Sequence, residues 1–209
     1  MLISEVFFSI QGEGREIGKP VVFIRTSGCN LKCDFCDTMY ADEGKEMAIP
    51  DIIHEVEKYK CGNVVITGGE PFLQKDLYVL IKGLLHTMKK NIFIETNGTI
   101  YDPSIIGFAE FIVSPKLDFL NKKYYNALKK WGIHADFKYV IRNVDDIINA
   151  KAVSDLCCPQ HSILMPEGNT QDSQIDYLDD IIEQTKKYFP DAQIIPRLHS
   201  IVYNGRRGF

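Results

Sequence analysis

The sequence predicts an α/β protein with a mostly parallel sheet, because short apolar segments alternate with amphipathic segments along the chain. The apolar segments are rich in β-branched and aromatic residues, as buried strands are. They lie at residues 21–26, 63–67, 91–96, 111–114, 137–141, 162–165 and 193–198. Buried strands that alternate with helices favour βα units, in which the strands run parallel and helices cover the sheet.

Apolar residues at helical spacing predict the covering helices. One stripe runs through residues 77–88 and a second through 175–188, and weaker helices are expected at 52–59 and 144–156. Six or seven strands are compatible with an open sheet or a partial barrel, whereas a complete eight-stranded barrel typically needs ~250 residues. The 209 residues contain no linker and no repeat, so we expect one domain spanning residues 1–209.

The composition excludes several classes of protein. Hydrophobic residues make up 45% of the chain, which is too high a share for a disordered protein. The net charge of −4 argues against a protein whose main task is to grip nucleic acid phosphates. No apolar run approaches the ~20 residues that span a bilayer, and the first residues do not resemble a signal peptide. We therefore expect a cytoplasmic protein without nucleic acid or membrane partners.

Special residues gather directly after the predicted strands. Ser27-Gly28-Cys29 follows the first strand, Gly68-Gly69-Glu70-Pro71 the second and Asn97-Gly98-Thr99 the third. Pro115-Lys116 and Pro166-Glu167-Gly168 follow later strands. Loops favour Gly, Pro and Asn on conformational grounds alone. Ligands in parallel α/β folds bind at the carboxyl ends of the strands, so the coincidence at five loops favours one shared site.

Three of the six cysteines lie within eight residues, in the pattern Cys29-x3-Cys33-x2-Cys36. Structural zinc usually has four ligands, and no second cysteine or histidine pair follows nearby; His54 is expected to lie in a helix. Ferredoxin clusters also use four cysteines. Three ligands leave one iron of a [4Fe-4S] cluster open to a substrate or cofactor, which favours a catalytic centre. The other cysteines, interpreted as buried or incidental thiols, are Cys61, Cys157 and Cys158.

The cysteine pattern, with an aromatic residue before its last cysteine, resembles the motif of the radical S-adenosylmethionine (SAM) superfamily. Gly68-Gly69-Glu70-Pro71 resembles the SAM-binding motif of that superfamily. The resemblance implies a reduced, partial (βα) barrel of mostly parallel strands. It also implies that Cys29, Cys33 and Cys36 hold a catalytic [4Fe-4S] cluster, from which an electron cleaves SAM into methionine and a hydrogen-abstracting 5′-deoxyadenosyl radical.

Further motifs resemble the 7-carboxy-7-deazaguanine synthase family, the radical SAM lyases of 7-deazapurine (queuosine precursor) biosynthesis. They are FFSIQGEG at residues 7–14, Cys36-Asp37-Thr38, ETNG at residues 95–98 and Ser114-Pro115-Lys116. The resemblance covers about residues 4–168. It implies conversion of 6-carboxy-5,6,7,8-tetrahydropterin to 7-carboxy-7-deazaguanine with loss of ammonia, with SAM acting catalytically, Mg²⁺ as a further cofactor and a homodimer.

The same resemblance implies roles for individual residues. Arg25 should hold the substrate carboxylate with its guanidinium, and Thr38 should place its hydroxyl on Mg²⁺, which prefers oxygen ligands. On the residues alone, Arg25 could instead lie at a sheet edge and Thr38 could cap a helix or turn. The other expected substrate contacts are Ile10, Gln11, Gly12 and Thr67, with Glu13 nearby. The expected SAM contacts are Gly69, Ser114, Pro115, Lys116, Met165, Pro166, Glu167 and Gly168.

Two other functions stay open at this point. An activase of glycyl radical enzymes would share the cysteine loop and the glycine-rich motif, but it would not need Gln11, Arg25 and Thr38. A non-catalytic, zinc-binding α/β module would be colourless and free of iron. The basic pair Arg206 and Arg207 could bind an acidic electron donor such as flavodoxin, or belong to a mobile tail.

Overall fold

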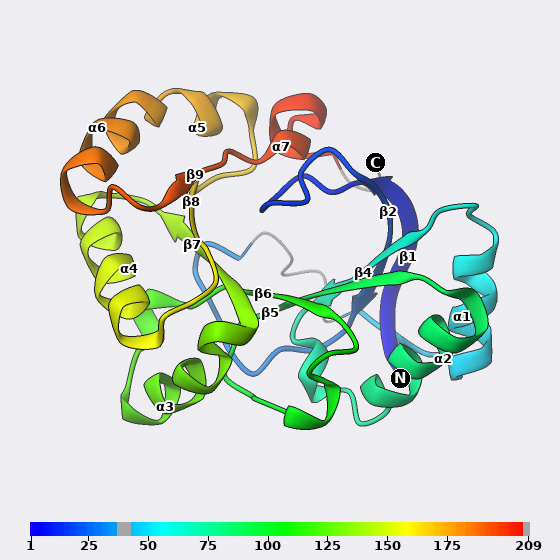
Figure 1. The fold of residues 1–209 in the computed structure, drawn as a ribbon. Coiled ribbons are helices and arrows are strands. Elements are labelled where there is room, and N and C mark those ends of the chain that lie inside the picture. Colours follow the sequence, from blue (N-terminus) through cyan, green and yellow to red (C-terminus); the bar gives the residue numbers. More distant parts are fainter. Residues whose placement is uncertain (37–42, 207–209) are drawn as a thin grey trace.

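The computed structural model describes residues 1–36 and 43–206, which form one curved sheet with helices on its outer side (Figure 1). Across the sheet, the strands follow the order β3-β1-β2-β4-β5-β6-β7-β8-β9. Their bounds are Leu2–Ile10 (β1), Pro20–Thr26 (β2), Lys45–Glu46 (β3), Asn63–Gly68 (β4), Asn91–Thr96 (β5), Glu110–Val113 (β6), Ala135–Ile141 (β7), Ser162–Pro166 (β8) and Gln193–Ile194 (β9).

The helices follow the strands as βα units require. The α-helices are Ile49–Glu57 (α1), Leu77–Met88 (α2), Lys122–Trp131 (α3), Val144–Cys157 (α4), Gln171–Ile175 (α5), Leu178–Tyr188 (α6) and Leu198–Tyr203 (α7). Short 3-10 helices lie at Pro71–Leu73, Pro103–Ile105, Leu117–Phe119 and Gly132–His134. Within the described ranges, no helix combines the length and apolar character that crossing a bilayer requires.

The sheet is mostly parallel. Strands β2 and β4–β9 run in one direction, whereas β1 and β3 are antiparallel to their neighbours. The sheet curves so that β2 and β8 lie on opposite sides of a shared interior (Figure 1). This arrangement confirms the predicted partial barrel of mostly parallel strands.

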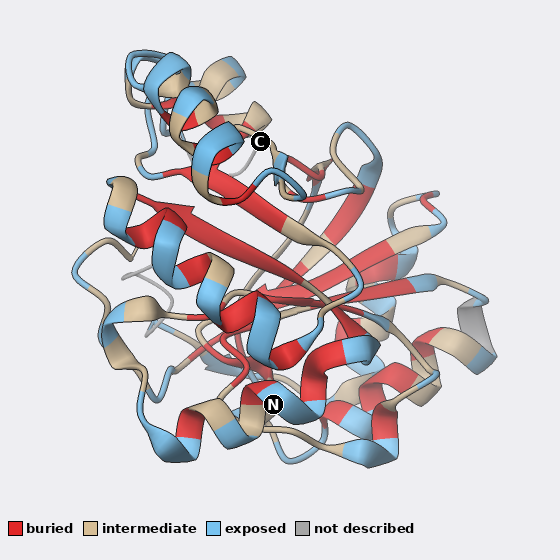
Figure 2. Cartoon of the chain, turned by 60° about the vertical axis from the view of Figure 1, so that its left-hand side comes forward, coloured by how far each residue is buried: buried red, intermediate tan, exposed pale blue. Residues whose placement is uncertain are grey.

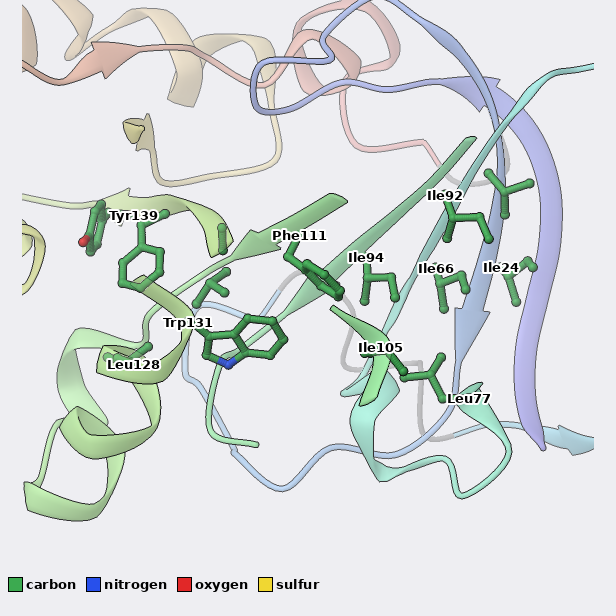
Figure 3. Close-up of a cluster of buried hydrophobic side chains, with 14 of the residues drawn as sticks. Ile24, Ile66, Leu77, Ile92, Ile94, Ile105, Phe111, Leu128, Trp131 and Tyr139 are labelled. Carbon is green, nitrogen blue, oxygen red and sulfur yellow. The ribbon is translucent and has the colours of Figure 1, made fainter. Parts of the chain in front are cut away.

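Each strand divides its residues between the two sides of the sheet, because successive side chains point in opposite directions. On the outer side, Ile24, Ile66 and Ile94 belong to the main core beneath the helices (Figure 3). On the inner side, Val65 and Phe93 belong to a smaller cluster at the base of the barrel. Figure 2 shows the resulting band of buried residues along the central strands. The next inward-facing positions carry polar side chains, which places them above this apolar base.

Helix α3 was not predicted, because its sequence KKYYNALKKW is rich in exposed lysines. The helix begins after Asn121, whose side chain accepts hydrogen bonds from the first backbone N–H groups. Leu128 and Trp131 are fully buried at helical spacing. The Trp131 ring lies 5.1 Å from the ring of Phe111 on β6 (Figure 3). Tertiary packing of one aromatic face therefore stabilises a helix whose composition is mostly polar.

Other elements differ from what the sequence predicts. Strands β1 and β3 were not predicted, and the expected helix at 175–188 is divided between α5 and α6. The expected strand at 193–198 is a strand only over β9, and Leu198 already begins α7. Pro196 lies between these elements and has no N–H to donate to a neighbouring strand.

The gap between the two ends of the sheet is bridged by irregular segments. Residues 11–19 connect β1 to β2 and extend toward the segment before α7 (Figure 1). The backbone N–H of Leu198 donates a 2.9 Å hydrogen bond to the carbonyl of Gly12. A Cβ at Gly12 would overlap the ring of His199, so the close approach of these segments requires glycine there.

Candidate active site

A cavity of about 520 Å³ opens inside the curve of the sheet, at the carboxyl ends of the parallel strands. Successive strands, or the loops that follow them, contribute its lining. The contributors from β2 to β8 include Arg25, Thr67, Glu95, Ser114, Lys138 and Met165. The three clustered cysteines line the same cavity. The expectation that loops after several strands share one site is met by this arrangement.

The cysteine loop is held against the glycine-rich loop after β4. The backbone N–H of Gly69 donates to the carbonyl of Thr26 at 3.1 Å, and that of Glu70 donates to the carbonyl of Gly28 at 2.8 Å. A Cβ at Gly69 would overlap the carbonyl oxygen of Gly28. Glycine at position 69 therefore lets the two loops pack backbone against backbone, directly before Cys29.

The cysteines present three thiols from one loop to the cavity. Cys29 is exposed, while Cys33 and Cys36 are partly buried. Desolvation by the surrounding protein atoms raises the pKa of the Cys29 and Cys33 thiols. Among the described residues, no three His, Cys, Asp or Glu side chains form a group that could hold a single metal ion. The donor set of three cysteine sulfurs beside an open cavity fits an iron–sulfur cluster with one iron left for another ligand.

Phe35, between the second and third cysteines, lies against two cations. The Lys116 ammonium is 5.7 Å from the centre of its ring and the Arg142 guanidinium carbon is 5.1 Å away. Arg142 is held in turn by two 2.8 Å hydrogen bonds to Asp118 and by further bonds to Asp146. Cation–π contacts therefore tie the cysteine loop to the loops after β6 and β7.

A buried ionic network lies on one wall of the cavity. Glu13 pairs with the Lys138 ammonium through one carboxylate oxygen and with Arg197 Nε at 3.0 Å through the other. Lys138 Nζ also lies 3.9 Å from Oε1 of Glu95. His199 Nε2 is 3.9 Å from Glu13. This network joins the residues after β1, the inner face of β7 and the start of α7.

The network favours the charged forms of Glu13 and Lys138. Burial alone would raise the pKa of Glu13, but Lys138, Arg197 and His199 outweigh it and hold that pKa well below its ordinary value. Burial alone would lower the pKa of Lys138, but Glu13 and Glu95 raise it. Both groups therefore keep their charges at neutral pH.

Glu95 is also oriented by two neutral donors. Gln11 Nε2 donates to Oε1 of Glu95 at 3.0 Å, and Thr67 Oγ1 donates to Oε2 at 2.9 Å. On β2, Arg25 Nε donates to Oε1 of Glu5 at 2.7 Å beside the cavity. The cavity wall thus carries carboxylates that are held in place by hydrogen bonds and by neighbouring cations.

The cavity gathers most of the residues that the sequence analysis singled out. Those in its lining are Ile10, Gln11, Arg25, Cys29, Cys33, Cys36, Thr67, Gly69, Ser114, Lys116 and Met165. Five expected contacts do not line it: Gly12, Pro115, Pro166, Glu167 and Gly168. The carbonyls of Pro166 and Gly168 instead accept hydrogen bonds from the buried Gln174. Thr38 lies outside the described residues.

Several residues of the cavity lining were not predicted from the sequence. Lys138 could have been found in the way that Arg25 was, because each is a charged residue inside an apolar strand (FKYVI and VVFIRT) and therefore needs a partner. Arg197 and His199 gave no comparable signal, because only the fold brings residues before and within α7 to the cavity. His54, by contrast, lies exposed on α1, and Cys61 and Cys157 are buried, as expected.

The fold and the three-cysteine loop define a class of protein. The pattern of the radical SAM superfamily matches residues 23–174, which is most of the chain. The chain is therefore a radical SAM protein, for which the superfamily implies a [4Fe-4S] cluster and SAM. The curated 7-carboxy-7-deazaguanine synthase of Aquifex aeolicus is 32% identical over 204 residues, covering 94% of this chain and 91% of the relative. The chain belongs to the 7-carboxy-7-deazaguanine synthase family.

Shorter and more similar matches agree with this assignment. The synthases of Thermoplasma acidophilum and Bacteroides thetaiotaomicron are 48% and 52% identical over 101 and 97 residues. These alignments cover 48% and 46% of this chain, and about half of each relative (48% and 52%). Among solved structures, QueE from Escherichia coli aligns with a TM-score of 0.71 and 25% identity, covering 95% of this chain and 94% of that one.

Proposed function

We propose that this chain converts 6-carboxy-5,6,7,8-tetrahydropterin to 7-carboxy-7-deazaguanine with release of ammonia. The observation that carries the proposal is one cavity that joins the three-cysteine loop to oriented carboxylates and an arginine. The amino-pyrimidinone edge of a pterin offers N–H donors, which suit the Glu95 carboxylate. The carboxylate of the substrate suits the Arg25 guanidinium, which can bind it through two hydrogen bonds.

The cofactors supply the radical chemistry, and the chain positions the reactants. The cluster, bound by Cys29, Cys33 and Cys36, would supply the electron for SAM cleavage and so the means of hydrogen abstraction. Gly69, Ser114, Lys116 and Met165 line the same cavity as the cysteine loop, which supports them as SAM contacts. The overall reaction removes ammonia without net oxidation, so a hydrogen taken from the substrate has to be returned. This balance agrees with catalytic use of SAM.

The deciding experiment is anaerobic turnover of the pterin with SAM, reductant and Mg²⁺. We expect a brown protein with about four irons per chain that forms the deazapurine. SAM cleavage with an inert pterin would keep the superfamily assignment and refute the substrate, as for a glycyl radical activase. A colourless protein with zinc and no iron would refute the enzyme.

Replacement of Arg25 by alanine should raise the KM for the pterin by about 10- to 100-fold, the range expected for a hydrogen bond to a charged partner. The KM for SAM should change less than about threefold. Steady-state kinetics with each reactant varied separately measures both values. Lysine at the same position should restore part of the affinity, because it keeps the charge but loses the fork geometry. Equal effects on both KM values would contradict the proposed role.

We also propose that Thr38 is a Mg²⁺ ligand, on the strength of the motif Cys36-Asp37-Thr38. Thr38→Ala should shift the Mg²⁺ concentration for half-maximal activity upward by about tenfold, because an oxygen ligand is lost. Thr38→Ser, which keeps the hydroxyl, is the matched control and should behave as the wild type does. An unchanged metal dependence in Thr38→Ala would remove Thr38 from the site.

For the electron donor we propose an acidic protein such as flavodoxin. Lys32 and Arg206 are exposed and line the same cavity as Cys29, which supports this choice because cations favour an acidic partner. We further propose a homodimer, supported by the exposed Leu2 and Phe8 on β1. A cytoplasmic location is proposed because the thiols of such a cluster need a reducing compartment.

A further inference from the structure

Asn97 lies directly after β5, in the ETNG segment, and the proposed function assigns it no role. Its side chain lines the cavity although the residue is only 5% exposed. An amide buried this deeply beside the cysteine loop needs hydrogen-bond partners. The hydrogen-bond partners of its backbone and of its side chain differ.

The backbone N–H and the backbone carbonyl of Asn97 are both hydrogen-bonded. Its N–H donates to Oε2 of the buried Glu70 at 2.7 Å. Its carbonyl accepts a hydrogen bond from the hydroxyl of Tyr124 on α3. These contacts use main-chain atoms, so they persist when the side chain is replaced.

The orientation of the Asn97 amide is also determined. The backbone N–H of Thr99 points at Oδ1 of Asn97 at 2.9 Å, and a backbone N–H can only donate. The oxygen end of the amide is therefore fixed, and the nitrogen end must face the other way. This removes the usual ambiguity between the two ends of an asparagine side chain.

The nitrogen end faces the cysteine loop. Nδ2 donates to Oδ1 of Asn30 at 2.9 Å and lies 3.8 Å from Sγ of Cys29, within the range of a hydrogen bond to sulfur. Hydrogen bonds to the sulfurs of an iron–sulfur cluster are among the factors that set its reduction potential. A donor near sulfur stabilises the extra negative charge of the reduced state more than the oxidised state.

We propose that Asn97 is a positioning residue that donates a hydrogen bond to the cluster ligand Cys29 and thereby raises the reduction potential of the bound cluster. The inference rests on the cluster part of the proposed function and not on the identity of the pterin. Its consequence is that an external one-electron donor reduces the cluster more easily than it would without Asn97.

The test is a redox titration of the reconstituted, SAM-free protein, followed by electron paramagnetic resonance. Asn97→Ser is the informative variant, because its shorter hydroxyl can still accept from Thr99 N–H but cannot reach Cys29. At the midpoint potential of the wild type, we expect the ratio of reduced to oxidised cluster to fall about three- to tenfold in this variant. Asn97→Ala should show the same fall.

Asn30→Ala is the matched control, because it removes the other partner of the same amide nitrogen and leaves the contact with Cys29. We expect its potential to equal that of the wild type. An unchanged potential in Asn97→Ser, or an equal shift in Asn30→Ala, would overturn the inference while leaving the proposed reaction intact. A wild-type protein that takes up no iron would overturn the proposed function and the inference with it.

Discussion

Replacement of Gly69 by alanine is expected to abolish SAM cleavage and to destabilise the protein by about 2–3 kcal/mol. The added Cβ would overlap the carbonyl oxygen of Gly28, which is main chain and cannot move without displacing Cys29. Overpacking against backbone costs energy of this order. Chemical unfolding of the metal-free protein measures the destabilisation. A SAM cleavage assay, with iron content after anaerobic reconstitution, measures the loss of function.

Gly62→Ala is the matched control for this change. A Cβ at Gly62 meets nothing within 4 Å, and the residue is exposed just before β4. We expect wild-type iron content and a free energy of unfolding within about 0.5 kcal/mol of the wild type. If Gly69→Ala retained iron and cleaved SAM as the wild type does, the packing of the two loops would not be what positions Cys29.

Replacement of Glu13 by glutamine should lower the free energy of unfolding by about 3 kcal/mol at pH 7, since removal of one partner leaves buried charge uncompensated. The side chains of Lys138 and Arg197, both paired with Glu13, are only 7% and 6% exposed. Denaturant unfolding of the metal-free protein measures the loss. Glu183→Gln, which breaks an exposed pair with Lys186, is the control and should cost less than about 1 kcal/mol.

The stability that Glu13 contributes should depend on pH, and the direction of this dependence can be predicted. The pKa of Glu13 is lowered on folding, so its contribution to stability is complete above the ordinary value of 4.5 and declines as the pH falls below it. The stability difference between wild type and Glu13→Gln should therefore shrink as the pH falls below 4.5. A difference that grew over this acid range would contradict the ionic pairing.

The sequence predicts the site residues at the ends of strands better than those that distant segments bring to the cavity. Arg25 and Thr67 could be placed because each lies near the carboxyl end of a strand whose apolar run is easy to see, and the carboxyl ends of parallel strands meet. The cysteine loop could be placed for the same reason. Local pattern thus predicts which strand ends carry chemistry, and the parallel sheet brings them together.

The residues that could not be predicted depend on distant contacts. Helix α3 has a polar sequence and is stabilised by the burial of Trp131. Arg197 reaches Glu13 only because an irregular segment crosses the open side of the sheet. No periodic pattern in the sequence indicates the burial of Trp131 or the ion pair of Arg197, because each depends on packing between segments far apart in the chain.

The hydrogen bond between Gly12 and Leu198 also has a consequence for the order of folding. Nearly the whole chain lies between these two residues, so the wall that they complete closes at a high entropic cost. During synthesis, the cysteine loop emerges from the ribosome long before residues 195–203 do. In a nascent chain, the thiols of the cysteine loop are therefore exposed to solvent before residues 195–203 complete the cavity. Any iron bound at that stage would enter a site that is still open on one side.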